Sequence, residues 1–225
     1  MGIRSFLAAL AFTATAATGA FAADIAPVAQ YDWSGYYAGL YAGYGFGGSH
    51  IFDNQINTGV TDFDSSFSLN GAIIGARGGW NQQRGQFVWG LEGDVGYNGA
   101  SSATPWPFGT SSTAKVDMDA SLRLRAGIAH DKALFYITGG PALGHVVADY
   151  YDTGGRHDNV STLAFGYTVG AGAEFAVSNN WLVGAEARFT NYGDAKGRTT
   201  TTDSNWYETN QIHETSVRLT VSKHF

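Results

Sequence analysis

The chain has 225 residues, with 13 basic and 19 acidic side chains and a formal net charge of −6. This acidic balance argues against a nucleic-acid partner, because phosphate binding needs a basic surface. The sequence contains no cysteine, so disulfides cannot stabilise it. It is rich in glycine and aromatic residues, with 31 Gly, 12 Tyr, 14 Phe and 6 Trp against 4 Pro, which favours long and closely packed strands.

The first residues resemble a targeting segment rather than folded structure. Arg4 is the only charge before Asp24, an Ala-rich apolar stretch covers 6–17, and Ala20-Phe21-Ala22 has the small-x-small pattern of a cleavage site. We therefore predict a cleaved secretory signal over residues 1–22 and a short periplasmic lead-in over 23–33. The alternative, a membrane-anchoring helix, is disfavoured because the apolar run is short.

The rest of the chain alternates apolar and polar residues with a period of two. This alternation fills eight segments, in chain order 36–46, 69–80, 86–97, 115–128, 133–147, 162–177, 181–192 and 212–225. None of them shows the 3.6-residue period of a helix. All eight segments run for more than ten residues, which is long for a soluble strand and suits a tilted strand that crosses a bilayer.

The segment at 115–128 shows the pattern most cleanly. Val116, Met118 and Leu124 share one face, while Arg123 and Arg125 share the other. Two irregularities are expected elsewhere. Phe67 and Leu69 break the alternation of the second segment, which suggests a β-bulge. Pro141 lacks an amide hydrogen, which predicts a bulge or weakened pairing in the fifth segment, whose apolar face is expected to end at Val147.

Connections between the segments alternate in length. Three are short, at 81–85, 130–132 and 178–180, and four are long and polar, at 47–66, 98–114, 149–160 and 193–211. Short periplasmic turns and long surface loops give this pattern in outer-membrane barrels. We therefore predict an all-β fold over 34–225, an eight-stranded antiparallel transmembrane β-barrel with both ends in the periplasm.

The two faces of the strands decide between this fold and a soluble barrel or sandwich, whose apolar side chains would point inward. One face is uniformly apolar and carries aromatic residues near the strand ends, namely Tyr36, Phe46, Trp80, Phe87, Tyr97, Trp181 and Phe225. The other face carries charges. Arg or Lys against lipid costs about 2–4 kcal/mol at the midplane, so the charges should face the lumen.

The inward face thus predicts a hydrogen-bonded ion network, because unpaired buried charges are costly. Its expected members are five basic and four acidic residues, Arg77, Arg123, Arg125, Arg188 and Arg218 with Glu92, Asp94, Glu174 and Glu186.

The chain resembles the Omp25/Omp31-like small outer-membrane proteins of alphaproteobacteria, a porin-family group of surface antigens. The resemblance rests on Asp32-Trp33-Ser34-Gly35-Tyr36-Tyr37-Ala38-Gly39, Gly90-Leu91-Glu92-Gly93-Asp94, Leu122-Arg123-Leu124-Arg125-Ala126-Gly127 and Val217-Arg218-Leu219. The terminal Phe225, preceded at alternate positions by Val217, Leu219 and Val221, resembles the signal read by the barrel-assembly machinery. The resemblance implies a location in the outer membrane of a Gram-negative bacterium, with roles in envelope integrity and surface contact.

Partners implied by this reading are outer-membrane lipids, lipopolysaccharide, the barrel-assembly machinery, and host or environmental ligands at the surface loops. Some relatives are described as haemin-binding or as porins, which leaves two alternatives open. His50, His145 and His157 fall in or near predicted loops and could ligate a haem iron. No other cofactor is expected.

Asp117 and Asp119, beside Lys115, could hold a divalent cation that bridges lipopolysaccharide. They are more simply explained as solvated charges at a strand end, and we expect no metal. A small passive porin is disfavoured because side chains fill an eight-stranded lumen. We expect no enzyme, because no convergent Ser/His/Asp set can be assembled from the sequence.

Overall fold

The computed structural model describes residues 31–55, 61–105, 111–151, 157–198 and 206–225. The predicted signal and most of the predicted lead-in lie outside these ranges and stay predictions. The described strands are β1 (Gly35–Gln55), β2 (Thr61–Arg84), β3 (Phe87–Asn98), β4 (Ser101–Pro105), β5 (Ser111–His130), β6 (Ala133–Tyr151), β7 (His157–Ala176), β8 (Trp181–Arg198) and β9 (Trp206–His224). No helix in these ranges is long and apolar enough to cross a membrane.

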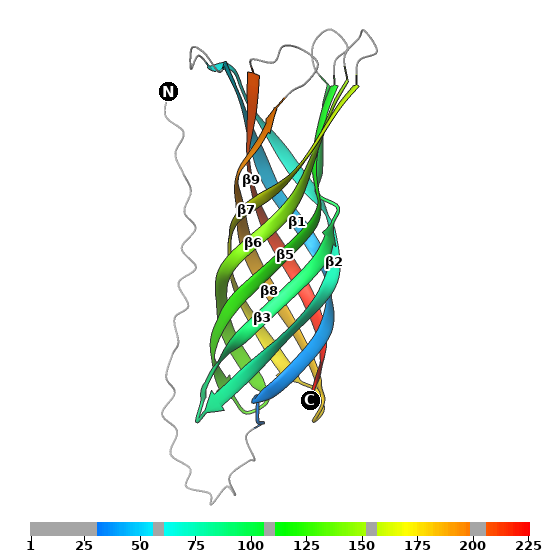
Figure 1. Ribbon diagram of the computed structural model, residues 1–225. Coiled ribbons are helices and arrows are strands. Elements are labelled where there is room, and N and C mark those ends of the chain that lie inside the picture. The colour runs from blue at the N-terminus through cyan, green and yellow to red at the C-terminus, as the bar shows by residue number, and fades with distance from the viewer. Residues whose placement is uncertain (1–30, 56–60, 106–110, 152–156, 199–205) are drawn as a thin grey trace, which may run out of the picture.

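All nine strands form one antiparallel sheet that closes on itself. β1 pairs with β2 on one side and with β9 on the other, so the first and last strands complete the circle. β3 and the short β4 lie end to end, and together they fill one strand position between β2 and β5. The strands thus occupy eight positions in a tall barrel of tilted strands, as the sequence predicted (Figure 1).

The predicted inward and outward faces are confirmed along most of the barrel. Leu124 and Leu163 point outward and are 68% and 72% exposed, while Arg123 and Glu92 are buried in the lumen. Side chains of a soluble protein would show the opposite distribution. The outward apolar residues are therefore the surface that lipid covers.

The three short turns lie at the predicted places, but the first is shorter than the predicted 81–85, because β2 continues to Arg84. β2 and β3 are joined through Gly85, whose φ is +61°, and β5 and β6 through Asp131, whose φ is 52°. Positive φ values of this kind suit tight hairpin turns. The third turn joins β7 to β8, and the C-terminus lies at the same end of the barrel (Figure 1).

The four predicted long loops are wrong in extent, because the strands continue far into them. β1 reaches Gln55, β5 begins at Ser111, β7 begins at His157 and β8 reaches Arg198. Apolar and polar residues alternate only along the part of a strand that contacts lipid, so the pattern ends at the edge of the membrane. Backbone pairing needs only a neighbouring strand, so the hairpins extend beyond the apolar band.

The bulge expected near Leu69 is absent, because β1 and β2 keep one register from Gly35↔Asn81 to Asp53↔Phe63. A bulge occurs instead in β5, where the register with β6 shifts between Val116 and Met118. Val116 is consequently buried rather than outward, which corrects its predicted orientation.

Two expectations for β6 have different outcomes. Val147 was expected on the exposed face and is buried, because the regular alternation fails close to the bulge. Pairing between β5 and β6 lapses beside Pro141, between Ser121↔Ala142 and Leu124↔Gly139, without a shift of register. The weakened pairing is confirmed and the bulge is not, since the missing amide hydrogen costs one bond but no extra residue is inserted.

Inward glycines give the lumen tyrosines room to lie across neighbouring strands. A Cβ atom at Gly79 would stand 2.5 Å from the Leu91 carbonyl oxygen and 2.6 Å from the Tyr37 hydroxyl. At the outward Gly93 the nearest atom, the Ser121 carbonyl oxygen, would be 3.7 Å away. The two glycines lie on adjacent strands, and only the inward one is sterically required.

We predict that Gly79→Ala lowers the free energy of unfolding by about 1–3 kcal/mol, the usual cost of overpacking. Gly93→Ala, the matched control, should change it by less than about 0.5 kcal/mol. Urea titration of the protein folded in lipid vesicles, followed by tryptophan fluorescence, measures both. Equal stability of the two variants would contradict the steric role of Gly79.

Candidate functional site: the charged lumen

The structure brings all nine predicted lumen residues into one buried cluster. They come from β2, β3, β5, β7, β8 and β9, and each is at most 7% exposed. We call this cluster, together with the partners described below, the lumen network. Its nine predicted members are Arg77, Glu92, Asp94, Arg123, Arg125, Glu174, Glu186, Arg188 and Arg218.

Glu92 on β3 is the carboxylate with the most partners in the lumen network. It pairs with Arg77 and Arg123, and its Oε2 lies 3.3 Å from Arg125 Nη1. The Tyr37 hydroxyl donates a hydrogen bond to the same oxygen at 2.5 Å. Glu174 completes this side, with Oε1 2.8 Å from Arg77 Nη1 and Oε2 2.5 Å from Arg125 Nη2.

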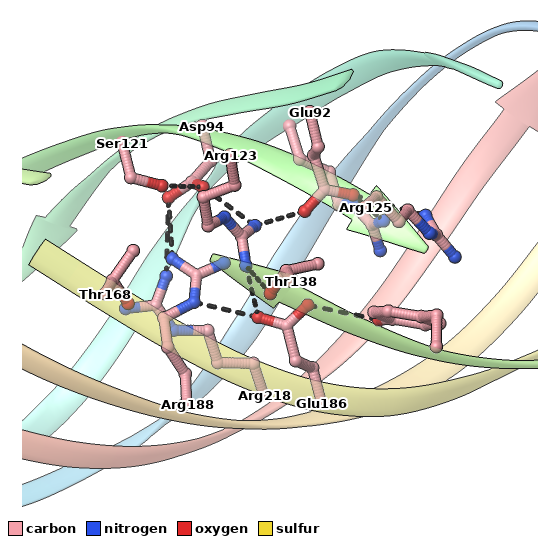
Figure 2. Close-up of polar contacts among 12 residues, drawn as sticks. Glu92, Asp94, Ser121, Arg123, Arg125, Thr138, Thr168, Glu186, Arg188 and Arg218 are labelled. Carbon is pink, nitrogen blue, oxygen red and sulfur yellow. Dashed lines mark hydrogen bonds and ion pairs between the residues drawn. The ribbon is translucent and has the colours of Figure 1, made fainter. Parts of the chain in front are cut away.

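Arg123 links this group to a second one (Figure 2). Its Nη1 donates to Glu186 Oε1 at 2.8 Å, and its Nη2 donates to Asp94 Oδ2 at 3.0 Å. Arg188 joins the same two carboxylates, with 2.8 Å to Asp94 Oδ1 and 2.8 Å to Glu186 Oε1. Every guanidinium in the two groups thus has more than one carboxylate partner.

The sequence reasoning missed a fifth acid. Asp119 is buried, and its Oδ2 lies 3.3 Å from Arg218 Nη2. Its inward parity with Arg123 and Arg125 on β5 was available as a signal, although it was interpreted as a solvated charge. With Asp119 included, five arginines form ion pairs with five carboxylates, while a sixth buried acid, Glu214, accepts a hydrogen bond from Asn98 at 2.7 Å.

Two tyrosines also belong to the lumen network, and charge counting could not have found them. Tyr37 accepts a hydrogen bond from Arg125 at 3.0 Å while it donates to Glu92. Tyr136 donates to Glu186 at 3.1 Å, and the Arg125 guanidinium stacks 3.7 Å from the centre of its ring. These rings add cation–π attraction to the ion pairs.

Buried apolar clusters lie on both sides of the lumen network. The cluster on the side of the long hairpins contains one residue from each of seven neighbouring strand positions in the barrel. Its members are Leu69, Ala100, Val116, Val146, Ala164, Tyr192 and Ile212. On the periplasmic side it contains Trp33, Val88, Ala129, Leu134, Tyr136, Ala176 and Leu182. The charges therefore lie between two apolar layers.

The end of the predicted lead-in closes the periplasmic mouth, which was not foreseen. Trp33 is fully buried, and its backbone amide donates to Gln83 Oε1 at 2.8 Å. Tyr31 packs edge-on against it, with ring centroids 5.0 Å apart, and its hydroxyl donates to the Asn179 carbonyl at 3.1 Å. Burial raises the pKa of Tyr31, so this hydroxyl stays a donor at ordinary pH.

The predicted histidines are not gathered into one site. His50 lies on β1 and His145 on β6, four strand positions apart on opposite walls of the barrel. His157 begins β7, and its side chain lies outside the described part of the structure. Both ring nitrogens of His145 are engaged, Nδ1 at 2.6 Å from Asp117 Oδ1 and Nε2 at 2.7 Å from Ser161 Oγ.

The possible cation site is also divided. Asp119 turns into the lumen toward Arg218, whereas Asp117 pairs with His145. Lys115 precedes both on β5 and is half-buried. Among the described residues no group of three or more acidic or histidine side chains could hold a metal ion. Asp117, His145 and Ser161 form a hydrogen-bonded Ser/His/Asp set, which could not be assembled from the sequence.

The predicted assembly signal lies on the lipid-facing side of β9 and its end. Its four members, Val217, Leu219, Val221 and Phe225, are all exposed and point outward. Inward residues alternate with them, among them Arg218 of the lumen network and the buried Ser216 and Ser222.

A closed barrel with apolar walls and charged contents defines an integral protein of the outer membrane. The family model described as outer membrane protein beta-barrel domain matches residues 5–225. The chain belongs to this family, and within it to the group of the Brucella 25 kDa and 31 kDa outer-membrane immunogenic proteins.

The similarity to these relatives extends over most of both chains. The 25 kDa protein of Brucella abortus is 33% identical over 171 residues, which cover 76% of this chain and 70% of that protein. The 31 kDa protein of Brucella melitensis is 31% identical over 203 residues, covering 79% and 82%. The protein is accordingly located in the outer membrane of a Gram-negative bacterium.

A solved structure shares the fold. The outer membrane protein OprG of Pseudomonas aeruginosa superimposes with a TM-score of 0.55 at 11% identity, covering 87% of this chain and 98% of that one. At this level of identity the likeness shows the fold alone.

We predict that Glu92→Gln lowers the free energy of unfolding by about 3–5 kcal/mol, because it removes a negative charge that Arg77, Arg123 and Arg125 share in the buried lumen and leaves an excess of positive charge there. Asp131→Asn, in the exposed turn between β5 and β6, is the matched control and should be close to neutral. Urea unfolding in lipid vesicles measures both. A Glu92→Gln variant as stable as Asp131→Asn would show that the lumen network does not stabilise the barrel.

Proposed function

We propose that the protein is a structural component of the outer membrane, with a closed lumen and a surface that contacts other molecules through its extended hairpins. The observation that carries the proposal is the filled lumen. A layer of paired charges lies between two apolar clusters, and the network side chains are at most 7% exposed. Such an interior supports a rigid wall rather than a passage for solutes.

Electrostatics favours a closed lumen over a conducting one. To admit a hydrated solute, the barrel would have to separate Arg123 from Glu186 and Asp94, which lie 2.8 Å and 3.0 Å away. Breaking such buried pairs costs several kcal/mol each. β3 and β5, which carry Asp94 and Arg123, are paired without a break from Phe87↔Ile128 to Tyr97↔Met118, so these two strands do not separate to open a passage.

The surface role is supported by the hairpins. β1–β2, β6–β7 and β8–β9 each remain paired well beyond the apolar band, up to Asp53↔Phe63, Tyr151↔His157 and Arg198↔Tyr207. Paired strands hold their tips in place and display them away from the membrane. The proposed partners are lipids and lipopolysaccharide along the wall, the barrel-assembly machinery at the outward row of β9, and host or environmental ligands at the tips.

The two alternatives named for the family remain predictions with less support. A haemin site built from His50 and His145 would have to join opposite walls, and His145 already contacts Asp117 and Ser161. A saturable Soret shift that His50→Ala weakens would revive this alternative. A porin needs a passage, which the lumen network and its two apolar clusters obstruct.

We predict that the folded protein gives no stepwise conductance in planar lipid bilayers at concentrations where a known porin does. The reason is that ions would have to cross both apolar clusters and the paired charges. Unboiled and boiled samples should migrate differently in detergent gels, which checks that the barrel tested is folded. Regular current steps that Arg123→Ala alters in size would overturn the closed-lumen proposal.

The envelope role predicts a weaker outer-membrane barrier when the gene is deleted. Uptake of a hydrophobic dye should rise and return to normal with the wild-type protein or Asp131→Asn. Leu124→Arg should fail to restore it, since it places a charge against lipid at a cost of about 2–4 kcal/mol. Unchanged dye uptake in the deletion strain would exclude this role.

A further inference from the structure

Asp117, His145 and Ser161 form a hydrogen-bonded chain outside the lumen network. Their separations are 2.6 Å between Asp117 Oδ1 and His145 Nδ1 and 2.7 Å between His145 Nε2 and Ser161 Oγ. A carboxylate only accepts hydrogen bonds, so Nδ1 carries the ring proton and Nε2 is left to accept from the serine hydroxyl. This is the order of contacts that activates serine as a nucleophile.

The bulge in β5 creates this arrangement. Val116 pairs with Val146 and Met118 with His145, which leaves Asp117 as the extra residue between them. A bulge re-aims the side chain of the inserted residue, and here the carboxylate meets the histidine of the next strand. Ser161 lies on β7, where it pairs with Val147 of β6, two residues after His145. Three adjacent strands thus supply one residue each.

The three side chains are accessible from outside the barrel. His145 and Asp117 are 35% and 31% exposed at their side chains, and Ser161 is exposed. The residues next to them on the same wall, Met118, Leu143 and Leu163, are exposed and apolar. The set therefore lies at the hairpin-side edge of the lipid-facing band, the depth at which acyl chains are joined to lipid headgroups.

We propose that Ser161 and His145 are the catalytic residues, and Asp117 the positioning residue, of an acyl-ester hydrolase that acts on outer-leaflet lipids. Ser161 is the nucleophile, His145 the general base and acid, and Asp117 the group that orients and stabilises the imidazolium. The acyl chain of the substrate lies along the apolar wall below, at Leu143 and Leu163. The activity is separate from the structural role of the lumen.

The reaction balances with water as the only co-substrate. Ser161 Oγ attacks the ester carbonyl carbon while His145 Nε2 takes the hydroxyl proton, and the carbon–oxygen bond to the lipid alcohol breaks as His145 returns that proton to it. Water, deprotonated by His145, then attacks the acyl-serine and releases a fatty acid and free Ser161. Lys115 pairs with Val147, and Val147 pairs with Ser161, so Lys115 and Ser161 lie level with each other, two strands and about 10 Å apart. The Lys115 side chain can place positive charge near the oxyanion.

The first test is covalent labelling of the folded protein in detergent with a fluorophosphonate probe, which reacts only with activated serines. Labelling is expected at Ser161 in the wild type and absent from Ser161→Ala. Asp117→Asn should slow it by on the order of 10⁴-fold, the effect of removing the acid of such a triad. Ser178→Ala, in the exposed periplasmic turn, is the matched control and should label like the wild type.

The second test identifies the lipid. Vesicles of lipopolysaccharide and vesicles of phosphatidylethanolamine are incubated separately with the protein, and released fatty acid is measured. Release from either one, lost in Ser161→Ala and His145→Asn but retained in Ser178→Ala, supports the proposal and names the substrate.

Gel mobility of unboiled samples shows that each variant is folded, since all three residues lie on the outside and their loss leaves the lumen network intact. Wild-type protein that is folded, labels no faster than Ser161→Ala and releases no fatty acid above that variant overturns the proposal. That result would leave the structural role untouched, because conductance and dye uptake test the latter.

Discussion

The constraint on which the rest of this structure depends is that a charged side chain cannot face lipid without a large cost in free energy. The strands carry five arginines at membrane depth, and each is turned inward. Once inside, an arginine must be paired, because the lumen offers it little water. The identity and spacing of the inward residues follow from this, including the acids on β3, β7 and β8 and the tyrosines that fill the remaining hydrogen-bonding positions.

The same constraint explains the glycines. Arginine and tyrosine side chains are long, and a narrow barrel can hold them only where the neighbouring strands carry inward glycines. Gly75 and Gly96 both face the Tyr41 hydroxyl, and Gly172 faces that of Tyr136. Bulky inward residues therefore need inward glycines beside them, and this packing accounts for the high tyrosine and glycine content of the sequence.

Much of this could be predicted from the sequence because lipid imposes a simple period. The outward face of nearly every strand and nine of the ten charges of the lumen network were readable from alternation alone. The length of the strands beyond the apolar band could not be predicted, since backbone pairing there leaves no hydropathy pattern in the sequence. Trp33 was predicted to end a periplasmic lead-in, and its place in the barrel mouth depends on Gln83, fifty residues away.

The bulge at Asp117 shows the limit most clearly. One inserted residue shifts parity without changing composition, so Val116 and Asp117 exchange the sides that strict alternation would give them. Asp117, His145 and Ser161 are separated by 28 and 16 residues along the chain. Only the pairing of three strands, together with that bulge, brings them within hydrogen-bonding distance, and neither can be read from spacing.

Closure of the barrel by β1 and β9 has a consequence for how the molecule is made. Arg218 lies on the last strand and Tyr37 on the first, and both reach partners that lie on β3 and β5. A barrel that lacks either strand would expose the charges of the lumen network to the bilayer interior. Assembly intermediates are therefore penalised at every stage before the seam is sealed, and insertion should proceed as an all-or-none event in which the order of synthesis has little influence on the order of folding.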